Sequence, residues 1–111
     1  MIGSTQAVRV WARPAPTDLR KGFGGLSALV ERELGQDLRV GDLYLFVSRR
    51  RHLAKVLTFD GTGLVLYTKR LARPRRFTKL WRRGSGGRAL RLTTAELNLF
   101  LEGAVRQRQR K

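Results

Sequence analysis

The segment from Lys69 to Arg91 holds ten basic residues and no acidic one, and it also contains Phe77 and Trp81. Guanidinium groups at this density suit phosphate binding, because arginine presents a planar fork of donors that matches two oxygens at once. The two aromatic rings could stack on unpaired bases, each contact contributing about 1–3 kcal/mol. Large aromatic residues are more often part of the core, and we expect that role here. The segment therefore predicts a polyanionic partner.

The chain as a whole is also strongly basic. It carries 24 Lys and Arg against 8 Asp and Glu, which gives a formal net charge of +16 over 111 residues. Such charge repels itself in the folded state and is neutralised when a polyanion binds. A solvated surface without a partner is the alternative, and RNA would satisfy the charge as well as DNA. We interpret the surface as nucleic-acid-binding, with predicted contacts at Arg49, Arg50, Arg51, Lys69, Arg70, Arg73, Arg75, Arg76, Lys79, Arg82 and Arg83.

The acidic residues and the single histidine give little support for catalysis. Each Asp or Glu falls at a predicted turn, helix cap or exposed surface, whereas a two-metal site needs several converging carboxylates. His52 follows three arginines, which would lower its pKa, so we interpret it as a phosphate contact or a surface residue. The Gly84–Gly87 loop lacks the Lys-Ser or Lys-Thr that follows a P-loop. We predict no enzymatic activity, no cofactor and no metal.

Length and composition indicate one small domain. A chain of 111 residues has room for one core, which we place in residues 1–105, with 106–111 as a disordered basic tail. There is no cysteine, so an oxidising compartment is not required. The longest apolar stretch, Leu43–Val47, is far shorter than the roughly 20 residues of a membrane span. We expect a cytoplasmic, nucleoid-associated protein with no membrane partner.

The first half of the chain predicts a strand followed by a helix. Ala7–Trp11 reads as a short strand that ends before Pro14. Thr17 and Asp18 are suitable N-cap residues, and Gly35 is a suitable C-cap. The predicted apolar stripe of this helix, regular from about Gly25 onward, consists of Phe23, Leu26, Val30 and Leu34.

An antiparallel meander is predicted next, with strands at Asp42–Ser48, Lys55–Asp60 and Leu64–Lys69. The first of these is apolar on both faces, since Leu43, Leu45 and Val47 alternate with Tyr44 and Phe46. Both faces therefore need a cover. Helices would cover one face; later strands, a second copy of the chain or another protein would cover the other.

The last third of the chain predicts two short strands and a second helix. The strands are placed around Phe77, Leu80 and Trp81, and at Ala89–Leu92. Thr93 and Glu96 form a capping box before an apolar stripe at Leu97, Phe100, Leu101 and Ala104. The predicted fold is α+β: a small antiparallel sheet of about five to six strands with two packed helices.

Three segments carry recognisable motifs: PTDLRKGFGGL at 16–26, DGTGLVLYTKRL at 60–71 and LTTAELNLFLEGA at 92–104. In order and spacing they resemble the accessory protein TnpB, or Orf2-like protein, of the insertion-sequence sixty-six family of bacterial mobile elements. The resemblance implies a small protein that is encoded beside a transposase and needed or helpful for transposition, and it carries over no catalytic residue. Arg20 and Lys21 match the first motif and join the predicted nucleic-acid contacts. The chain departs from the family at Ala72, where an acid is usual, and at Trp81-Arg82, where Trp-Pro is common.

These observations lead to two hypotheses. In the first, the protein binds DNA without catalysis at the ends of the element and assists the transposase, with arginines on the phosphates. In the second, it is a protein adaptor for the transposase, or a homodimeric scaffold, whose apolar sheet packs on its partner and whose affinity for nucleic acid is incidental.

Overall fold

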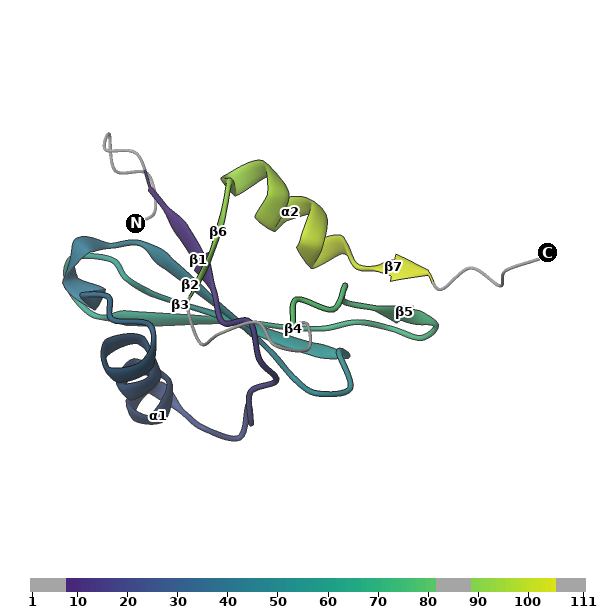
Figure 1. Cartoon of the computed structure of the whole chain (residues 1–111), viewed down its shortest axis with the longest axis horizontal. Coiled ribbons are helices and arrows are strands. Elements are labelled where there is room, and N and C mark those ends of the chain that lie inside the picture. The colour runs from purple at the N-terminus through teal and green to yellow at the C-terminus, as the bar shows by residue number, and fades with distance from the viewer. Residues whose placement is uncertain (1–7, 82–88, 106–111) are drawn as a thin grey trace.

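The computed structural model describes residues 8–81 and 89–105. A five-stranded sheet lies between two helical layers, with α1 on one face and α2 on the other (Figure 1). The strands are β1 (Val10–Ala12), β2 (Leu43–Val47), β3 (Leu53–Phe59), β4 (Leu64–Arg70), β5 (Arg75–Arg76), β6 (Leu90–Leu92) and β7 (Ala104–Val105). The helical elements are α1 (Phe23–Ala28), the π-helical turn η1 (Leu29–Glu33), the 3-10 turn η2 (Leu38–Val40) and α2 (Thr94–Glu102). The predicted α+β class is confirmed.

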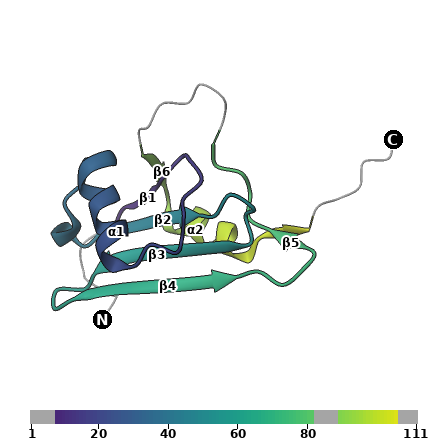
Figure 2. The ribbon, with the colours of Figure 1, turned by 90° about the horizontal axis from the view of Figure 1, so that it is seen from below.

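The meander is confirmed as the strands β2, β3 and β4, which pair antiparallel in chain order. The turn between β3 and β4 is fixed by Asp60, whose Oδ1 accepts hydrogen bonds from Thr62 N at 2.9 Å and Gly63 N at 3.0 Å. The full strand order is β4-β3-β2-β1-β6, which leaves β4 at one edge (Figure 2). A separate two-stranded sheet joins β5 to β7.

The sheet is mixed, not wholly antiparallel as predicted. β1 runs parallel to β2, with Val10 opposite Leu43 and Ala12 opposite Leu45. Parallel neighbours need a long crossover between them, and here the chain from β1 to β2 passes through α1. The antiparallel neighbour of β1 is β6. A strand at Ala89–Leu92 is confirmed, and it spans residues 90–92.

The first helix differs from its prediction at the N-terminus. Its N-cap is Gly22, and Thr17 and Asp18 lie in the preceding segment. Thr17 N donates to Val47 O at 2.9 Å, so this segment is held to the end of β2 and cannot enter the helix. Phe23 is 47% exposed and is not part of the buried stripe. Gly35 ends the helical region with a φ of +66°, in the left-handed conformation that glycine adopts readily.

Both faces of β2 are covered within the chain. Tyr44 and Phe46 pack with buried residues of the α1 layer, including Leu26 and Val30. Leu45 and Val47 pack on the other side in a cluster whose α2 residues are Leu97 and Phe100. No second copy or partner protein is needed to bury this strand.

The second helix begins as predicted. Thr93 Oγ1 accepts from Glu96 N at 3.0 Å, and Glu96 Oε1 accepts from Thr93 N at 2.8 Å, so the capping box is complete. The helix ends before Ala104, which belongs to β7 instead of the predicted stripe. Gly103, with a φ of +70°, makes this change of direction, and a Cβ there would collide with the side chain of Leu71.

The predicted strand around Phe77, Leu80 and Trp81 is wrong. The chain is extended earlier, at β5, and Phe77 instead points into the core with its side chain fully buried. Leu80 and Trp81 are half-buried and pack against the same cluster.

Candidate nucleic-acid interface

An open cleft of about 1130 Å³ lies where three segments of the chain meet. The segments are Thr17–Arg20 before α1, the turn between β2 and β3, and the end of β4 with the residues after it. We call this site the basic cleft. Its lining residues are Thr17, Asp18, Leu19, Arg20, Ser48, Arg49, Arg50, His52, Leu53, Arg70, Leu71 and Arg73.

Sheet register brings the second and third segments together. Arg70 at the end of β4 is opposite Leu53 at the start of β3, and Leu71 N donates to His52 O at 2.8 Å. The turn before β3 is closed by Ser48, whose N donates to Leu53 O at 2.9 Å. Arg49 and Arg50 at the tip of this turn are exposed. The two arginine-containing segments are therefore neighbours because β3 and β4 pair along their whole length.

The first segment reaches the cleft through the hydrogen bond between Thr17 and β2 described above. Its Arg20 forms a two-point ion pair with Asp18: Nε donates to Oδ1 at 2.9 Å and Nη2 to Oδ2 at 2.8 Å. The hydrogen bonds from Arg20 hold the pKa of the Asp18 carboxyl well below its usual range. Among the described residues that line the cleft, Asp18 is the only acid, so the charge of Arg20 is largely compensated and the charges of the other arginines are not.

The pKa of the His52 side chain depends on the environment of the cleft. Desolvation lowers its pKa, and the nearby charges of Arg76, Arg73, Arg50 and Arg70 lower it further. The predicted direction is confirmed, although burial and not the arginines is the leading cause. A histidine with a lowered pKa is neutral near pH 7, so its ring can donate a hydrogen bond to a phosphate without adding charge.

The cleft contains five of the predicted contacts, namely Arg20, Arg49, Arg50, Arg70 and Arg73. Two other predicted contacts hold the structure together. Arg51 Nη1 donates to Phe77 O at 3.3 Å, and Arg75 Nη1 donates to the carbonyls of Glu102 at 3.3 Å and Gly103 at 3.4 Å. Four more lie in the described part of the chain but do not line the cleft: Lys21, Lys69, Arg76 and Lys79. Arg82 and Arg83 fall outside the described residues, as does the predicted tail.

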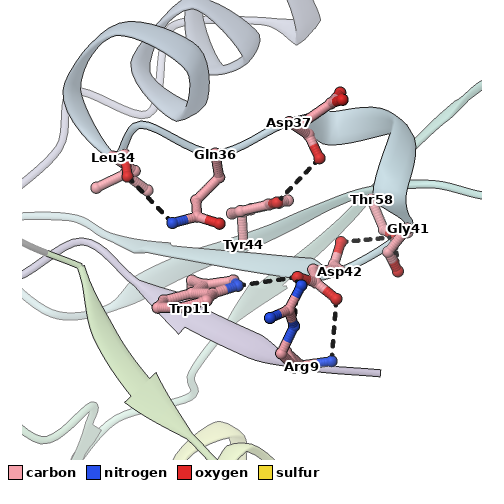
Figure 3. Close-up of polar contacts among 9 residues, drawn as sticks. All are labelled: Arg9, Trp11, Leu34, Gln36, Asp37, Gly41, Asp42, Tyr44 and Thr58. Carbon is pink, nitrogen blue, oxygen red and sulfur yellow. Dashed lines mark hydrogen bonds and ion pairs between the residues drawn. The ribbon is translucent and has the colours of Figure 1, made fainter. Parts of the chain in front are cut away.

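Asp42 has a role that the sequence did not indicate. We placed it at a turn, but it is 3% exposed and ties β1 to β2 (Figure 3). Its carboxylate accepts from Arg9 N at 3.1 Å and from Trp11 Nε1 at 3.0 Å, and it forms an ion pair with Arg9 Nε at 3.2 Å. Because its oxygens are committed to N–H donors, Asp42 is a structural residue. No local signal could have found it, since its partners lie more than 30 residues away.

Burial and the charge of Asp42 raise the pKa of Tyr44 to about 12. Its hydroxyl donates to Asp37 O at 3.4 Å (Figure 3). This phenol is therefore protonated at neutral pH, in keeping with a place in the core.

Within residues 8–81 and 89–105, no three His, Asp or Glu side chains are grouped so that they could bind a metal ion. In the same ranges, no helix is long and apolar enough to cross a membrane.

Comparison with known proteins finds a matching family model and similar proteins. The family model described as IS66 Orf2 like protein matches residues 8–111. The uncharacterized protein y4hO of Sinorhizobium fredii is 39% identical over 103 residues, which covers 93% of this chain and 86% of that protein. The uncharacterized protein y4jC of the same organism is 36% identical over 69 residues, or 62% of this chain and 59% of that protein. No solved structure gives a significant match.

Proposed function

Because this chain belongs to the IS66 Orf2-like family, which implies an accessory role in transposition, we propose that it fulfils this role by binding DNA at the basic cleft. The binding is non-catalytic. Its target is the end of the mobile element, where the protein assists the transposase of the same element.

The observation that carries this proposal is the charge of the cleft. Five arginines converge from three segments against one acid, and that acid is paired with Arg20. Arg49, Arg50, Arg70 and Arg73 remain to neutralise phosphates. Each neutralised phosphate contributes about −0.9 to the slope of log K against log salt on duplex DNA, so these four contribute about −3.6.

The basic residues outside the cleft extend the interface. With them, we expect about five to eight phosphate contacts and a slope of about −4 to −7. Arginines on phosphates fix position and orientation and carry no sequence information by themselves. We therefore propose that affinity for DNA comes mainly from contacts with its phosphate backbone and that any preference for a base sequence is secondary.

The structure removes the original reason for the adaptor hypothesis. That hypothesis relied on the two apolar faces of β2, and both are buried by the chain's own helical layers. The phosphate-binding role is the one that the geometry of the cleft favours.

The proposal is tested by fluorescence anisotropy with two labelled duplexes, the terminal inverted repeat of the element and a scrambled sequence of equal length. Salt-dependent binding that favours the repeat would show that the protein recognises the ends of the element. Equal, salt-dependent binding to both duplexes would show that the protein assists the transposase by binding DNA without sequence preference. A slope near zero, or no binding to either duplex, rejects DNA binding at the cleft.

A further inference from the structure

β4 is a long edge strand with an apolar surface. It spans seven residues, every one of which pairs with β3 on one side, and it ends the strand order of the sheet (Figure 2). Leu64 and Val65 are each 37% exposed, and Tyr67 is 51% exposed. Each face of the strand thus presents apolar side chains next to an edge with which no other strand of residues 8–81 and 89–105 pairs.

The peptide groups on the outer side of β4 follow from the register of the ladder. Hydrogen-bonded and non-hydrogen-bonded pairs alternate along an antiparallel ladder. Leu71 N donates to His52 O, so every second residue before Leu71 also directs its peptide groups toward β3. The groups that point away from β3 belong to Leu64, Leu66, Thr68 and Arg70.

The other edge of the same sheet is protected, and β4 is not. Natural edge strands avoid unwanted pairing by being short, by carrying charges or proline, or by bulging. β6 at the opposite edge has only three residues, with Arg91 at its centre. β4 has the apolar run LVLY, no proline and no break in its register, and its charges stand only at its end. Such an edge is suited to pairing with a further strand.

We propose that β4 pairs antiparallel with β4 of a second copy of this chain, about a twofold axis at Tyr67. Leu66 of one copy is then opposite Thr68 of the other, and Leu64 is opposite Arg70, so the four outward-facing residues all find partners. A twofold interface requires a self-complementary surface, and an antiparallel pair of identical strands is self-complementary by construction.

The local charges favour the antiparallel orientation. The strand has its two charged residues, Lys69 and Arg70, at its end. In the antiparallel pairing about Tyr67 these residues lie opposite Val65 and Leu64 of the other copy, so the two basic ends are kept apart. A parallel arrangement would instead align the basic ends and add repulsion.

The dimer would also place two basic clefts on one side of a continuous sheet, a consequence that relies on the proposed function. Leu66 is opposite Leu57, which belongs to the α1 layer, so Arg70 lies on that face too. In the paired strands the two copies of Arg70 are six residues apart, about 20 Å at 3.4 Å per residue. One duplex could then contact both clefts.

A single-cysteine variant tests the axis directly. The chain has no cysteine, so Y67C introduces the only thiol. Tyr67 would form a non-hydrogen-bonded pair with its copy, with Cα atoms about 4.5 Å apart, which permits a disulfide. The matched control is V40C, at a position that is 55% exposed and lies in the 3-10 turn η2, outside the edge strand.

Under mild oxidation without DNA, we expect Y67C to form covalent dimers at least about tenfold faster than V40C, since pairing raises the local thiol concentration from the micromolar to the millimolar range. Equal rates would overturn the proposal. The oxidation rates do not depend on DNA binding, so they test the dimer independently of the proposed function.

Sedimentation of the unmodified chain and of T68P provides a second test. Proline removes the outward N–H of Thr68 and leaves the bonds to β3 in place. We expect a dimer that T68P converts to a folded monomer. The dimer fraction should rise toward about 1 M salt, where repulsion between the two basic chains is screened. A wild-type monomer at every concentration and salt, or a dimer that T68P leaves intact, would overturn the proposal.

Discussion

The rings of Phe77 and Phe100 stack with centroids 5.2 Å apart and planes 10° from parallel. This contact joins the basic segment after β4 to helix α2. Phe77 is fully buried, so its ring belongs to the core and cannot stack on a base. The arginines around it are thereby attached to a rigid layer of the fold.

We predict that F77A lowers the free energy of unfolding by about 3–5 kcal/mol, because it removes a buried aromatic ring and leaves a cavity. F23A is the matched control: Phe23 is 47% exposed, and its loss should cost less than about 0.5 kcal/mol. Urea denaturation measures both. Equal losses of stability in the two variants would contradict the buried position of Phe77 in the core.

The turn at Asp60 predicts a pH dependence of stability. Hydrogen bonds from the backbone and hydroxyl of Thr62 and from Gly63 N lower the pKa of Asp60 from 3.8 to about 2. A group with a lowered folded-state pKa stabilises the fold above its ordinary value, and this contribution is lost as the pH falls through the lowered one. D60A should therefore melt below the wild type near neutral pH, and the difference should shrink between about pH 4 and pH 2. A difference in Tm that stays constant over this range would contradict the account.

The ion pair between Asp18 and Arg20 predicts a gain of DNA binding. D18N keeps an oxygen that can accept from Arg20 N but removes the negative charge, so Arg20 becomes available to a phosphate. We expect tighter binding and a salt slope steeper by up to about 0.9. The control is D37N, because Asp37 Oδ1 accepts from Arg39 N at 3.0 Å in the same local geometry but lies outside the cleft. If anisotropy titrations showed an equal gain of DNA affinity for D18N and D37N, the phosphates would bind outside the basic cleft.

Local sequence patterns predicted the parts of the fold whose stabilising contacts are local. The capping box of α2 needs only Thr93 and Glu96, and the β3–β4 turn needs only the residues from Asp60 to Gly63. Parallel pairing of β1 with β2 was missed because it depends on contacts between residues about 33 positions apart. The N-cap at Gly22 was missed for a similar reason, since Thr17 is held by β2.

In the candidate site, too, only the residues that local structure brings together could be predicted from the sequence. Arg49, Arg50 and Arg70 could be grouped from the meander alone, because a hairpin places its turn beside the end of the next strand. Arg20 came from the family motif, and only the structure shows that it shares the cleft with them. The structural roles of Arg51 and Arg75 depend on carbonyls that are distant in the sequence, so the number and spacing of charges could not predict them.

The central claim is that the basic cleft binds the phosphate backbone of DNA, and the salt slope of one double variant tests it most directly. R49A/R50A removes two cleft arginines, and R32A/R39A removes two exposed arginines outside the cleft, so both variants lose the same net charge. We predict that R49A/R50A flattens the slope of log K against log salt by about 1.8, and that R32A/R39A changes it by much less. Equal slopes for the two variants would contradict a phosphate-binding site at the cleft.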